Sequence, residues 1–468
     1  MILFAALTTL LFSAPTAPQD SQDWAGWRGP GGNGVAAGLP PLEWSEEQNV
    51  RWKTEIPGKG ISSPVSVGGR IFLTSAVATG ETPEPEPQPE PQGTGRRGGR
   101  GGFGRGAPPV EHDFLVLAID HETGEVIWEV VATTATPHEG THGDGSFATP
   151  TIATDGETLF VSFGSVGIFA YDLQGKLLWK TDLGDMSIMF SFGEGISPVL
   201  ADDKLMILWQ HNGDSFLAAL NTADGKEIWR QKRESGSSWC TPTCVETEAG
   251  TLVIVPGATT TAYHAADGRI AWTHKAAATA QQGTGDRGGR GGAGGRGRRG
   301  GGGGSGVIAS AVAGDGVVYL STGSRGGSFL ALHIEAQEAD GGEESDRVAW
   351  SRPGGTPYVP SPILYDGIFY SLKSNSAILL AVDAATGEVL YEGQRMDGLG
   401  DSYASPIAAG GRLYFTGRDG TCEVVRAGPK FESLAVNVLD DSIDASPAVV
   451  GNTLLLRGRT YLYCIAEQ

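Results

Sequence analysis

Cysteine is scarce in this chain: there are only four in 468 residues, and no two of them are adjacent. So few cysteines in a chain of this length do not form a disulfide framework. We predict that Cys240, Cys244, Cys422 and Cys464 are buried free thiols rather than parts of a bridge or a metal site. The sequence also lacks Cys-x-x-Cys-His, so nothing indicates covalent attachment of haem.

Positive charge is scarce as well. The chain has 34 Lys and Arg against 54 Asp and Glu, which gives a formal net charge of -20. Because nucleic acids are polyanions, so acidic a protein is not expected to bind them.

Long hydrophobic runs are missing too, and no segment is long and apolar enough for a transmembrane helix. Residues 1–18 contain a short apolar core that resembles a signal peptide, although no Lys or Arg precedes it. We therefore expect an exported protein of the periplasm or cell envelope; a buried apolar segment or a wrongly assigned start is the alternative. No cysteine follows the apolar core, so a lipid anchor is not expected there.

One short unit recurs along the chain. Phe216–Trp229 reads FLAALNTADGKEIW, and related phrases occur at Phe114–Trp128, Ile168–Trp179, Tyr263–Trp272 and Leu379–Tyr391. Each copy has an apolar strand, a turn with Asp or Asn and Gly, and a second strand that ends in an aromatic residue. Glycine provides the positive φ of a tight turn, and the Asp or Asn side chain caps it. The unit therefore predicts a β-hairpin.

A second unit, Ser/Thr-Pro followed by two strands, precedes the hairpins. From Pro150 onward its uninterrupted spacings are 48, 44, 51, 44 and 41 residues, a length that is typical of a four-stranded propeller blade. We predict an all-β fold, an eight-bladed β-propeller of four-stranded antiparallel blades. The Ser/Thr-Pro pairs are Ser63-Pro64, Thr149-Pro150, Ser197-Pro198, Thr241-Pro242, Ser361-Pro362, Ser405-Pro406 and Ser446-Pro447, with Ser310-Ala311 between the fourth and fifth.

The two ends of the chain are expected to meet in one blade. The last repeat, residues 445–467, has only three strands, and residues 49–56 form an isolated strand that can complete it and remove two open edges. The lead-in is expected to lie across the propeller surface, with Trp24 and Trp27 as anchors. The predicted parts are a signal peptide at 1–18, a Gly/Pro-rich lead-in at 23–48, a propeller at 49–467, and disordered low-complexity inserts at 78–112 and 276–306.

The repeat resembles a known family. Ala118–Trp128, AIDHETGEVIW, and its variant Ala219–Trp229, ALNTADGKEIW, are similar to the pyrroloquinoline-quinone (PQQ) propeller repeat, and Trp27–Val35, WRGPGGNGV, adds to the likeness. The chain thus resembles the PQQ-binding-like β-propeller repeat proteins, which are related to the outer-membrane protein assembly factor BamB and to quinoprotein alcohol dehydrogenases. The resemblance implies that the tryptophans dock on the turn of the neighbouring blade: Trp128, Trp179, Trp229, Trp272 and Trp350.

The same resemblance bears on the cofactor. Quinoprotein dehydrogenases hold PQQ against a disulfide of adjacent cysteines, beside a Ca²⁺ site of Glu, Asn and Asp. This chain has no adjacent cysteines, and no local motif marks such a Ca²⁺ site. We therefore assign no catalytic residue and keep PQQ with Ca²⁺ only as an alternative. The assembly factor is a lipoprotein, whereas this chain lacks the lipobox cysteine.

A ligand site is expected where the loops entering the blades and those after the second strands converge around the ring axis. The sequence His138-x-x-x-His142-x-Asp144 has residue types that suit Zn²⁺ or Cu²⁺. On a loop, however, this spacing does not place both imidazoles on one side, so we predict no metal site. The candidate ligand-binding residues are His138, His142, Asp144, Glu194, His211, Asn212, Trp239, Arg325, Lys373, Asp401, Arg418 and Asp444.

Together these features predict an exported, monomeric, non-enzymatic binding or scaffold module at the cell envelope. Its partner would be an envelope protein or a small ligand, not a nucleic acid. Two alternatives stay open, namely a PQQ-dependent oxidoreductase and an outer-membrane protein assembly factor.

Overall fold

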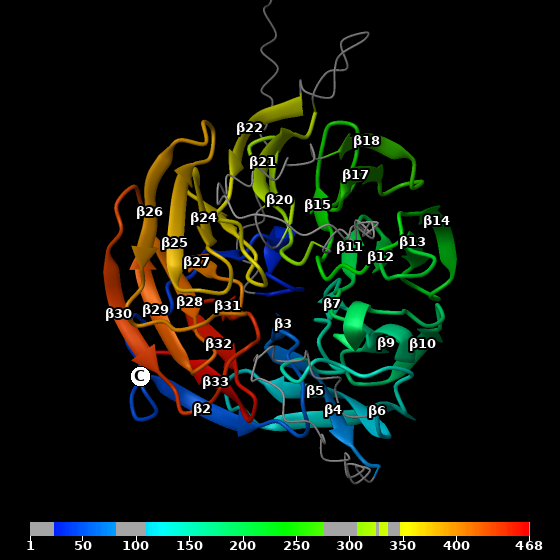
Figure 1. The fold of residues 1–468 in the computed structure, drawn as a ribbon. Coiled ribbons are helices and arrows are strands. Elements are labelled where there is room, and N and C mark those ends of the chain that lie inside the picture. The colour runs from blue at the N-terminus through cyan, green and yellow to red at the C-terminus, as the bar shows by residue number, and fades with distance from the viewer. Residues whose placement is uncertain (1–22, 81–108, 276–306, 324–326, 336–346, 468) are drawn as a thin grey trace, which may run out of the picture.

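The computed structural model describes residues 23–80, 109–275, 307–323, 327–335 and 347–467. In these residues eight β-sheets are arranged as blades around a central axis (Figure 1). The prediction of an all-β, eight-bladed propeller is therefore confirmed. The predicted signal peptide and most of the two low-complexity inserts lie outside the described residues.

Each blade consists of four strands in antiparallel order, with the first strand nearest the axis. Blades one to four comprise β3 (Val65–Val67), β4 (Arg70–Ala78), β5 (His112–Asp120) and β6 (Val126–Ala135); β7 (Ala153–Thr154), β8 (Thr158–Ser162), β9 (Ile168–Asp172) and β10 (Leu177–Thr181); β11 (Val199–Ala201), β12 (Lys204–Trp209), β13 (Phe216–Asn221) and β14 (Glu227–Lys232); and β15 (Thr243–Val245), β16 (Leu252–Val255), β17 (Thr259–His264) and β18 (Ile270–Lys275).

The second half of the ring has the same design. Blades five to eight comprise β19 (Val312–Gly314), β20 (Val317–Ser321), β21 (Ser328–His333) and β22 (Val348–Pro353); β23 (Ile363–Tyr365), β24 (Ile368–Leu372), β25 (Ile378–Asp383) and β26 (Val389–Arg395); β27 (Ile407–Ala409), β28 (Arg412–Thr416), β29 (Thr421–Arg426) and β30 (Ser433–Val438); and β31 (Ala448–Val450), β32 (Thr453–Arg457), β33 (Tyr461–Ile465) and β2 (Val50–Glu55). The described residues also contain three short 3-10 helices: η1 (Pro30–Gly32), η2 (Gly164–Val166) and η3 (Met189–Ser191).

The ring closes as predicted, because β2 pairs antiparallel with β33 and becomes the outer strand of blade eight. Trp52 on β2 then occupies the position that the repeat gives to tryptophan. Its indole nitrogen donates a hydrogen bond of 2.9 Å to the carbonyl of His121 in blade one. The first and last blades are thus joined by the contact that joins the others.

The repeated tryptophans dock on the next blade, as the resemblance implies. The indole nitrogen of Trp179 donates to the Thr222 carbonyl at 2.8 Å, and a Cβ added to Gly225, whose φ is 69°, would lie 2.5 Å from the indole ring. Only glycine fits there, since the turn needs both a positive φ and room for the ring. The same bond joins Trp128 to Leu173, Trp229 to Ala265 and Trp350 to Ala384, while Trp272 has Arg347 over its ring at 4.6 Å.

Hydroxyl groups link the inner strands around the axis. Each link runs from a backbone N–H to a Ser or Thr hydroxyl in the next blade, and in blade two the hydroxyl belongs to Thr151 rather than Thr149. The links are Ser63 to Thr151, Thr151 to Ser197, Ser197 to Thr241, Thr241 to Ser310, Ser310 to Ser361, Ser361 to Ser405 and Ser405 to Ser446. The recurring Ser/Thr therefore satisfies buried backbone donors, a requirement of any buried segment.

The lead-in occupies the axis. Trp24 is buried beside Ser66, Asn33 exchanges hydrogen bonds with Ala313, and β1 (Val35–Ala36) pairs in parallel with the inner strand β27. Blade seven thereby gains a fifth strand that the sequence did not predict. Of the two expected anchors, Trp24 is buried and Trp27 is only partly so.

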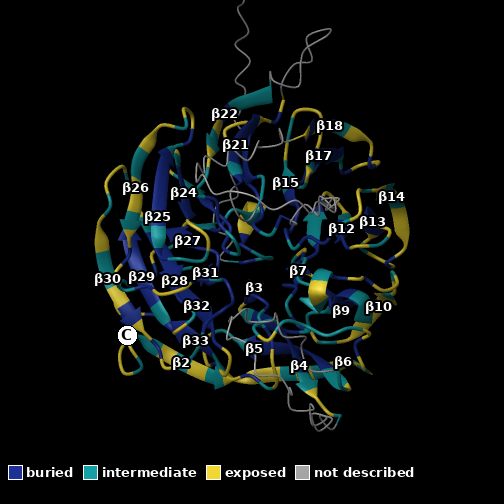
Figure 2. Cartoon of the chain, in the orientation of Figure 1, coloured by how far each residue is buried: buried dark blue, intermediate teal, exposed yellow. Residues whose placement is uncertain are grey.

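In each blade, burial decreases from the axis outward. The inner and middle strands are buried on both sides, because neighbouring sheets cover them, while the outermost strands are exposed (Figure 2). In the part of the chain that the structure describes, no helix has the length and hydrophobicity needed to cross a membrane.

Candidate functional site at the loop face

One face of the ring carries the connections between blades and those between second and third strands; we call it the loop face. The connection from β6 to β7, residues 136–152, reaches across the loop face to blades seven and eight. Its Asp144 meets residues of blades seven and eight, which are more than 250 positions away in the sequence. The loop face is therefore assembled from distant parts of the chain.

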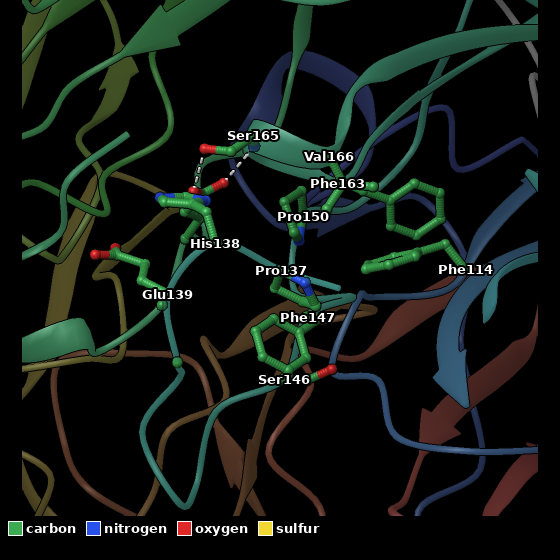
Figure 3. A pocket seen from close by; sticks show the side chains of 13 residues that line it. Phe114, Pro137, His138, Glu139, Ser146, Phe147, Pro150, Phe163, Ser165 and Val166 are labelled. Carbon is green, nitrogen blue, oxygen red and sulfur yellow. Dashed lines mark hydrogen bonds between the residues drawn. The ribbon is translucent and has the colours of Figure 1, made fainter. Parts of the chain in front are cut away.

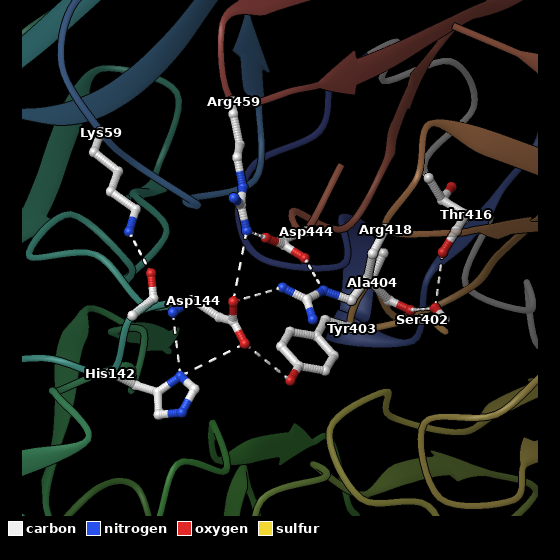
Figure 4. Close-up of polar contacts among 11 residues, drawn as sticks. Lys59, His142, Asp144, Ser402, Tyr403, Ala404, Thr416, Arg418, Asp444 and Arg459 are labelled. Atoms are coloured by element: carbon white, nitrogen blue, oxygen red, sulfur yellow. Dashed lines mark hydrogen bonds and ion pairs between the residues drawn. The ribbon is translucent and has the colours of Figure 1, made fainter. Parts of the chain in front are cut away.

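Four charged side chains and a tyrosine form what we call the rim network (Figure 4). Arg418 lies 3.0 Å from Oδ1 of Asp144 and 2.7 Å from Oδ1 of Asp444. Arg459 lies 2.9 Å from Oδ2 of Asp444 and 3.8 Å from Asp144. The hydroxyl of Tyr403 donates to Asp144 at 3.4 Å, and the guanidinium of Arg418 stacks 3.9 Å from the Tyr403 ring.

Charge pairing shifts the titration of this network. Partial burial acts to raise the pKa of Asp144, but the hydrogen bond and charge of Arg418 outweigh it, so that the pKa lies below its ordinary value. Partial burial likewise acts to lower the pKa of Arg418, and Asp444 and Asp144 together raise it above the ordinary value. Asp144 and Arg418 are therefore both charged at neutral pH.

Two further side chains support the Asp144 loop. Lys59 donates to the carbonyl of Gly143 at 2.8 Å, and Nδ1 of His142 accepts the Asp144 N–H at 3.1 Å. The His142 ring also meets Phe192 edge to face, with 5.2 Å between centroids. His142 thus connects the rim network to the aromatic residues of the neighbouring connection.

A second group lies beside blades one and two, at a pocket of about 390 Å³ that includes space open to solvent (Figure 3). Ligand-type atoms of His138, Glu139 and Glu194 lie within 4.8 Å of one another. Both carboxylate oxygens of Glu194 accept hydrogen bonds from Ser165, at 2.7 Å from the amide and 2.5 Å from the hydroxyl. Burial raises the pKa of Glu194 to about 7.

Three more predicted residues hold the connection that contains η3. Nδ1 of His211 accepts the Ser187 N–H at 2.9 Å, and the Trp239 indole donates to the Gly193 carbonyl at 2.8 Å. The amide oxygen of Asn212 accepts a hydrogen bond from Ser237 at 3.2 Å. These residues act here by positioning the connection.

The structure brings part of the predicted set together. His142, Asp144, Arg418 and Asp444 meet at the rim network, and His138 and Glu194 meet at the pocket. Lys373 and Asp401 are exposed and take no part in the ion pairs of the network. Arg325 lies outside the described residues.

Sequence reasoning missed Lys59, Glu139, Ser165 and Arg459. A signal existed for Arg459, because it follows β32, the second strand of blade eight, just as Arg418 follows the second strand of blade seven. The rule that selected Arg418 therefore also selects Arg459. For Ser165 no such signal exists, since its role depends on a hydrogen bond to Glu194, 29 positions away.

Comparison with protein families gives a clear match. A model described as outer membrane protein assembly factor BamB matches residues 112–389 and 215–466. The chain belongs to this family of PQQ-like β-propeller repeat proteins. Among curated proteins, none is significantly similar to this BamB-family chain in sequence.

Solved structures extend the comparison of the BamB-family chain. BamB from Moraxella catarrhalis has a TM-score of 0.51 and 12% identity, over 75% of this chain and 88% of that one. A europium-containing methanol dehydrogenase has a TM-score of 0.59 and 11% identity, over 94% and 89%. The quinohemoprotein alcohol dehydrogenase from Comamonas testosteroni has a TM-score of 0.57 and 12% identity, over 96% and 81%. At such low identity the likeness shows the fold alone.

The dehydrogenase relatives raise the question of PQQ, a planar quinone with several carboxylates. Such a group needs cations free of counter-charge and a flat surface for stacking. In this BamB-family chain Arg418 and Arg459 are paired with Asp144 and Asp444, and Arg418 itself stacks on Tyr403. The axis below is occupied by the lead-in with β1. The residues at the rim therefore do not fit PQQ.

Proposed function

We propose that this protein is an exported binding or scaffold module of the cell envelope and that its loop face contacts a protein partner. The observation that carries the proposal is the presentation of Phe190 on η3. Its side chain is 69% exposed, and both it and Ser191 have left-handed backbone, with φ of 56° and 53°. Each such residue costs about 1–3 kcal/mol, and strain of this kind clusters at functional sites.

Phe190 belongs to an aromatic surface that it forms with Phe192 and Trp239. The ring centroids of Phe190 and Phe192 are 5.6 Å apart, and those of Phe192 and Trp239 are 6.4 Å apart. Beneath them, Ser237 accepts the Met189 N–H at 2.8 Å. Aromatic side chains held in a fixed arrangement are enriched at the centres of protein interfaces.

The rim network gives this aromatic surface a charged border. His142 contacts Phe192 on one side and Asp144 on the other. An apolar centre with a polar border is the usual anatomy of a protein–protein interface. The export and envelope parts of the proposal are supported by the signal-like residues 1–18 and by the family, whose description names an outer-membrane assembly factor.

Site-specific cross-linking tests the proposal. A photoreactive amino acid replaces Phe190, and a matched control replaces Val438, which is 53% exposed on the outer strand β30. In envelope fractions of cells that express the protein, we expect one defined adduct from position 190 and none from position 438. Equal labelling at both positions, or no adduct at position 190, would contradict the proposal.

The identity of the adduct separates the scaffold from the assembly-factor alternative. An adduct with an outer-membrane protein or its assembly machinery would support the narrower assignment. An adduct with another envelope protein would support the general one.

A PQQ-dependent oxidoreductase remains the alternative from another class. One observation favours it: the repeats at Ala118–Trp128 and Ala219–Trp229 are similar to the PQQ propeller repeat. Against it stands the pairing of the rim arginines with aspartates. Under this alternative the purified chain would retain PQQ and reduce a dye.

A further inference from the structure

The pocket beside blades one and two brings three metal-ligating side chains together from two connections. His138 and Glu139 come from the connection between β6 and β7 (Figure 3). Glu194 comes from the connection between β10 and β11. Their nitrogen and oxygen ligand atoms all lie within 4.8 Å of one another. Ligand atoms about 2.1 Å from a tetrahedral ion are about 3.4 Å apart, so the three side chains must move together to close around an ion.

The tautomer of His138 suits a ligand. Its Nε2 lies 2.7 Å from the carbonyl oxygen of Met186, and because a carbonyl can only accept, Nε2 must carry the proton. Nδ1 then has a lone pair to offer, and it lies 3.8 Å from Oδ1 of Asp185. A metal-binding histidine normally donates its other ring N–H to a carbonyl or carboxylate in this way.

The two carboxylates are held by hydrogen bonds that leave lone pairs available. Glu194 accepts the two bonds from Ser165, and Oε1 of Glu139 accepts the Ile188 N–H at 2.8 Å. Each carboxylate oxygen has two acceptor positions, so each of these groups can still bind a cation. The hydrogen bonds fix the direction of the ligands before any ion arrives.

The electrostatics also favour a cation. Glu139 and Glu194 are both carboxylates, and their ligand oxygens lie within 4.8 Å of each other. A divalent ion between the carboxylates would remove their repulsion and compensate for the burial.

We propose that His138, Glu139 and Glu194 bind one divalent transition-metal ion, with Zn²⁺ as the best match. Imidazole with carboxylate is a ligand set for Zn²⁺, whereas Ca²⁺ requires six to eight oxygens. The ion would tie together the two connections that flank blade two, which is a role independent of the partner proposed above.

Titration of the full-length chain tests the site. The protein is prepared without an affinity tag, stripped of metal with a chelator, and titrated with Zn²⁺ by calorimetry; thermal unfolding is recorded with and without the ion. We expect one Zn²⁺ per chain, an increase in Tm, and no displacement by an equal concentration of Ca²⁺. Absence of saturable binding, or displacement by Ca²⁺, would overturn the proposal.

Substitutions of the proposed ligands test whether these side chains bind the ion. Glu194→Gln keeps the shape of the side chain, and His138→Ala removes the imidazole; each should weaken Zn²⁺ binding about 100-fold or more and abolish the increase in Tm. His333→Ala, at the exposed end of β21, is the matched control and should change neither quantity. Equal weakening in all three variants, or none in Glu194→Gln, would show that the ion binds elsewhere.

Discussion

The joints between blades and the rim network both connect separate blades, but they do so through different contacts. At the joints, Trp52, Trp128 and Trp179 each donate one indole hydrogen bond to a carbonyl of the next blade. At the rim, blades seven and eight are connected to the β6–β7 connection by side chains that occur once, such as Asp144 and Arg418. The difference shows that repetition specifies the stable ring, while the unrepeated loops are left to form a site.

The largest predicted effect is at the closure of the ring. Trp52→Ala removes an aromatic ring that packs on blade one and the bond to His121, so the free energy of unfolding should fall by about 3 kcal/mol. Urea denaturation of the variant measures it. Trp229→Ala, at an internal joint, is the comparison and should lose a similar amount. A negligible loss for Trp52→Ala would mean that the ends of the ring are not held by this contact.

The turns that receive the tryptophans should be the next most sensitive. Gly225→Ala places a methyl group 2.5 Å from the Trp179 ring at a φ of 69°, and should cost about 2 kcal/mol. Gly316→Ala is the control, because its φ of 73° is similar but nothing lies within 4 Å, and should cost about 1 kcal/mol. Thermal unfolding of the pair isolates the docking contact. Equal costs would refute docking as the reason for glycine.

The rim network should be less costly to disrupt. Arg418→Met leaves Asp444, whose side chain is only 1% exposed, with Arg459 alone, and should destabilise by about 2 kcal/mol. Arg426→Met breaks the exposed pair with Glu432 and should cost well under 1 kcal/mol. Chemical denaturation of both variants gives the comparison. If Arg418→Met were as mild as Arg426→Met, the network would not couple the blades.

The smallest effect concerns pH. Because the pKa of Asp144 is below its ordinary value in the folded chain, its contribution is complete above the unfolded pKa and is lost as pH falls through the folded pKa. Asp144→Asn should therefore lower Tm slightly and by a constant amount above about pH 5, and the difference should vanish in stronger acid. A difference that grows with acidity would contradict the assigned ion pairs.

The sequence predicted the ring well because its information is local and repeated. Asp-x-x-x-Gly turns and terminal aromatics can be found along the chain, and the missing strand of the last blade pointed directly to β2. The strand β1 was not predicted, because its two residues, Val35 and Ala36, are too few to show an alternating hydrophobic pattern. Their place is set by contact with β27, some 370 positions later.

For the candidate site, the sequence predicted which loops contribute to it but not how their residues group. Topology alone indicated that Asp144, Arg418 and Asp444 belong to one face, and the structure brings them into contact. The sequence could not predict that His138 lies beside Glu139 and Glu194, because the spacing of residues along the chain does not give the distance between two connections of the ring. His138 and His142 do not act as a pair, because His142 lies at the rim network beside Asp144 while His138 lies at the pocket.

We expect the loop face to bind rather than to catalyse, and reconstitution with PQQ and Ca²⁺ tests this most directly. The purified chain is mixed with both, passed over a desalting column, and supplied with an artificial electron-acceptor dye and a range of alcohols and sugars. We predict that no quinone absorbance stays with the protein and that the dye is not reduced. Retained absorbance with sustained, substrate-dependent dye reduction would contradict the account and identify the chain as a quinoprotein dehydrogenase.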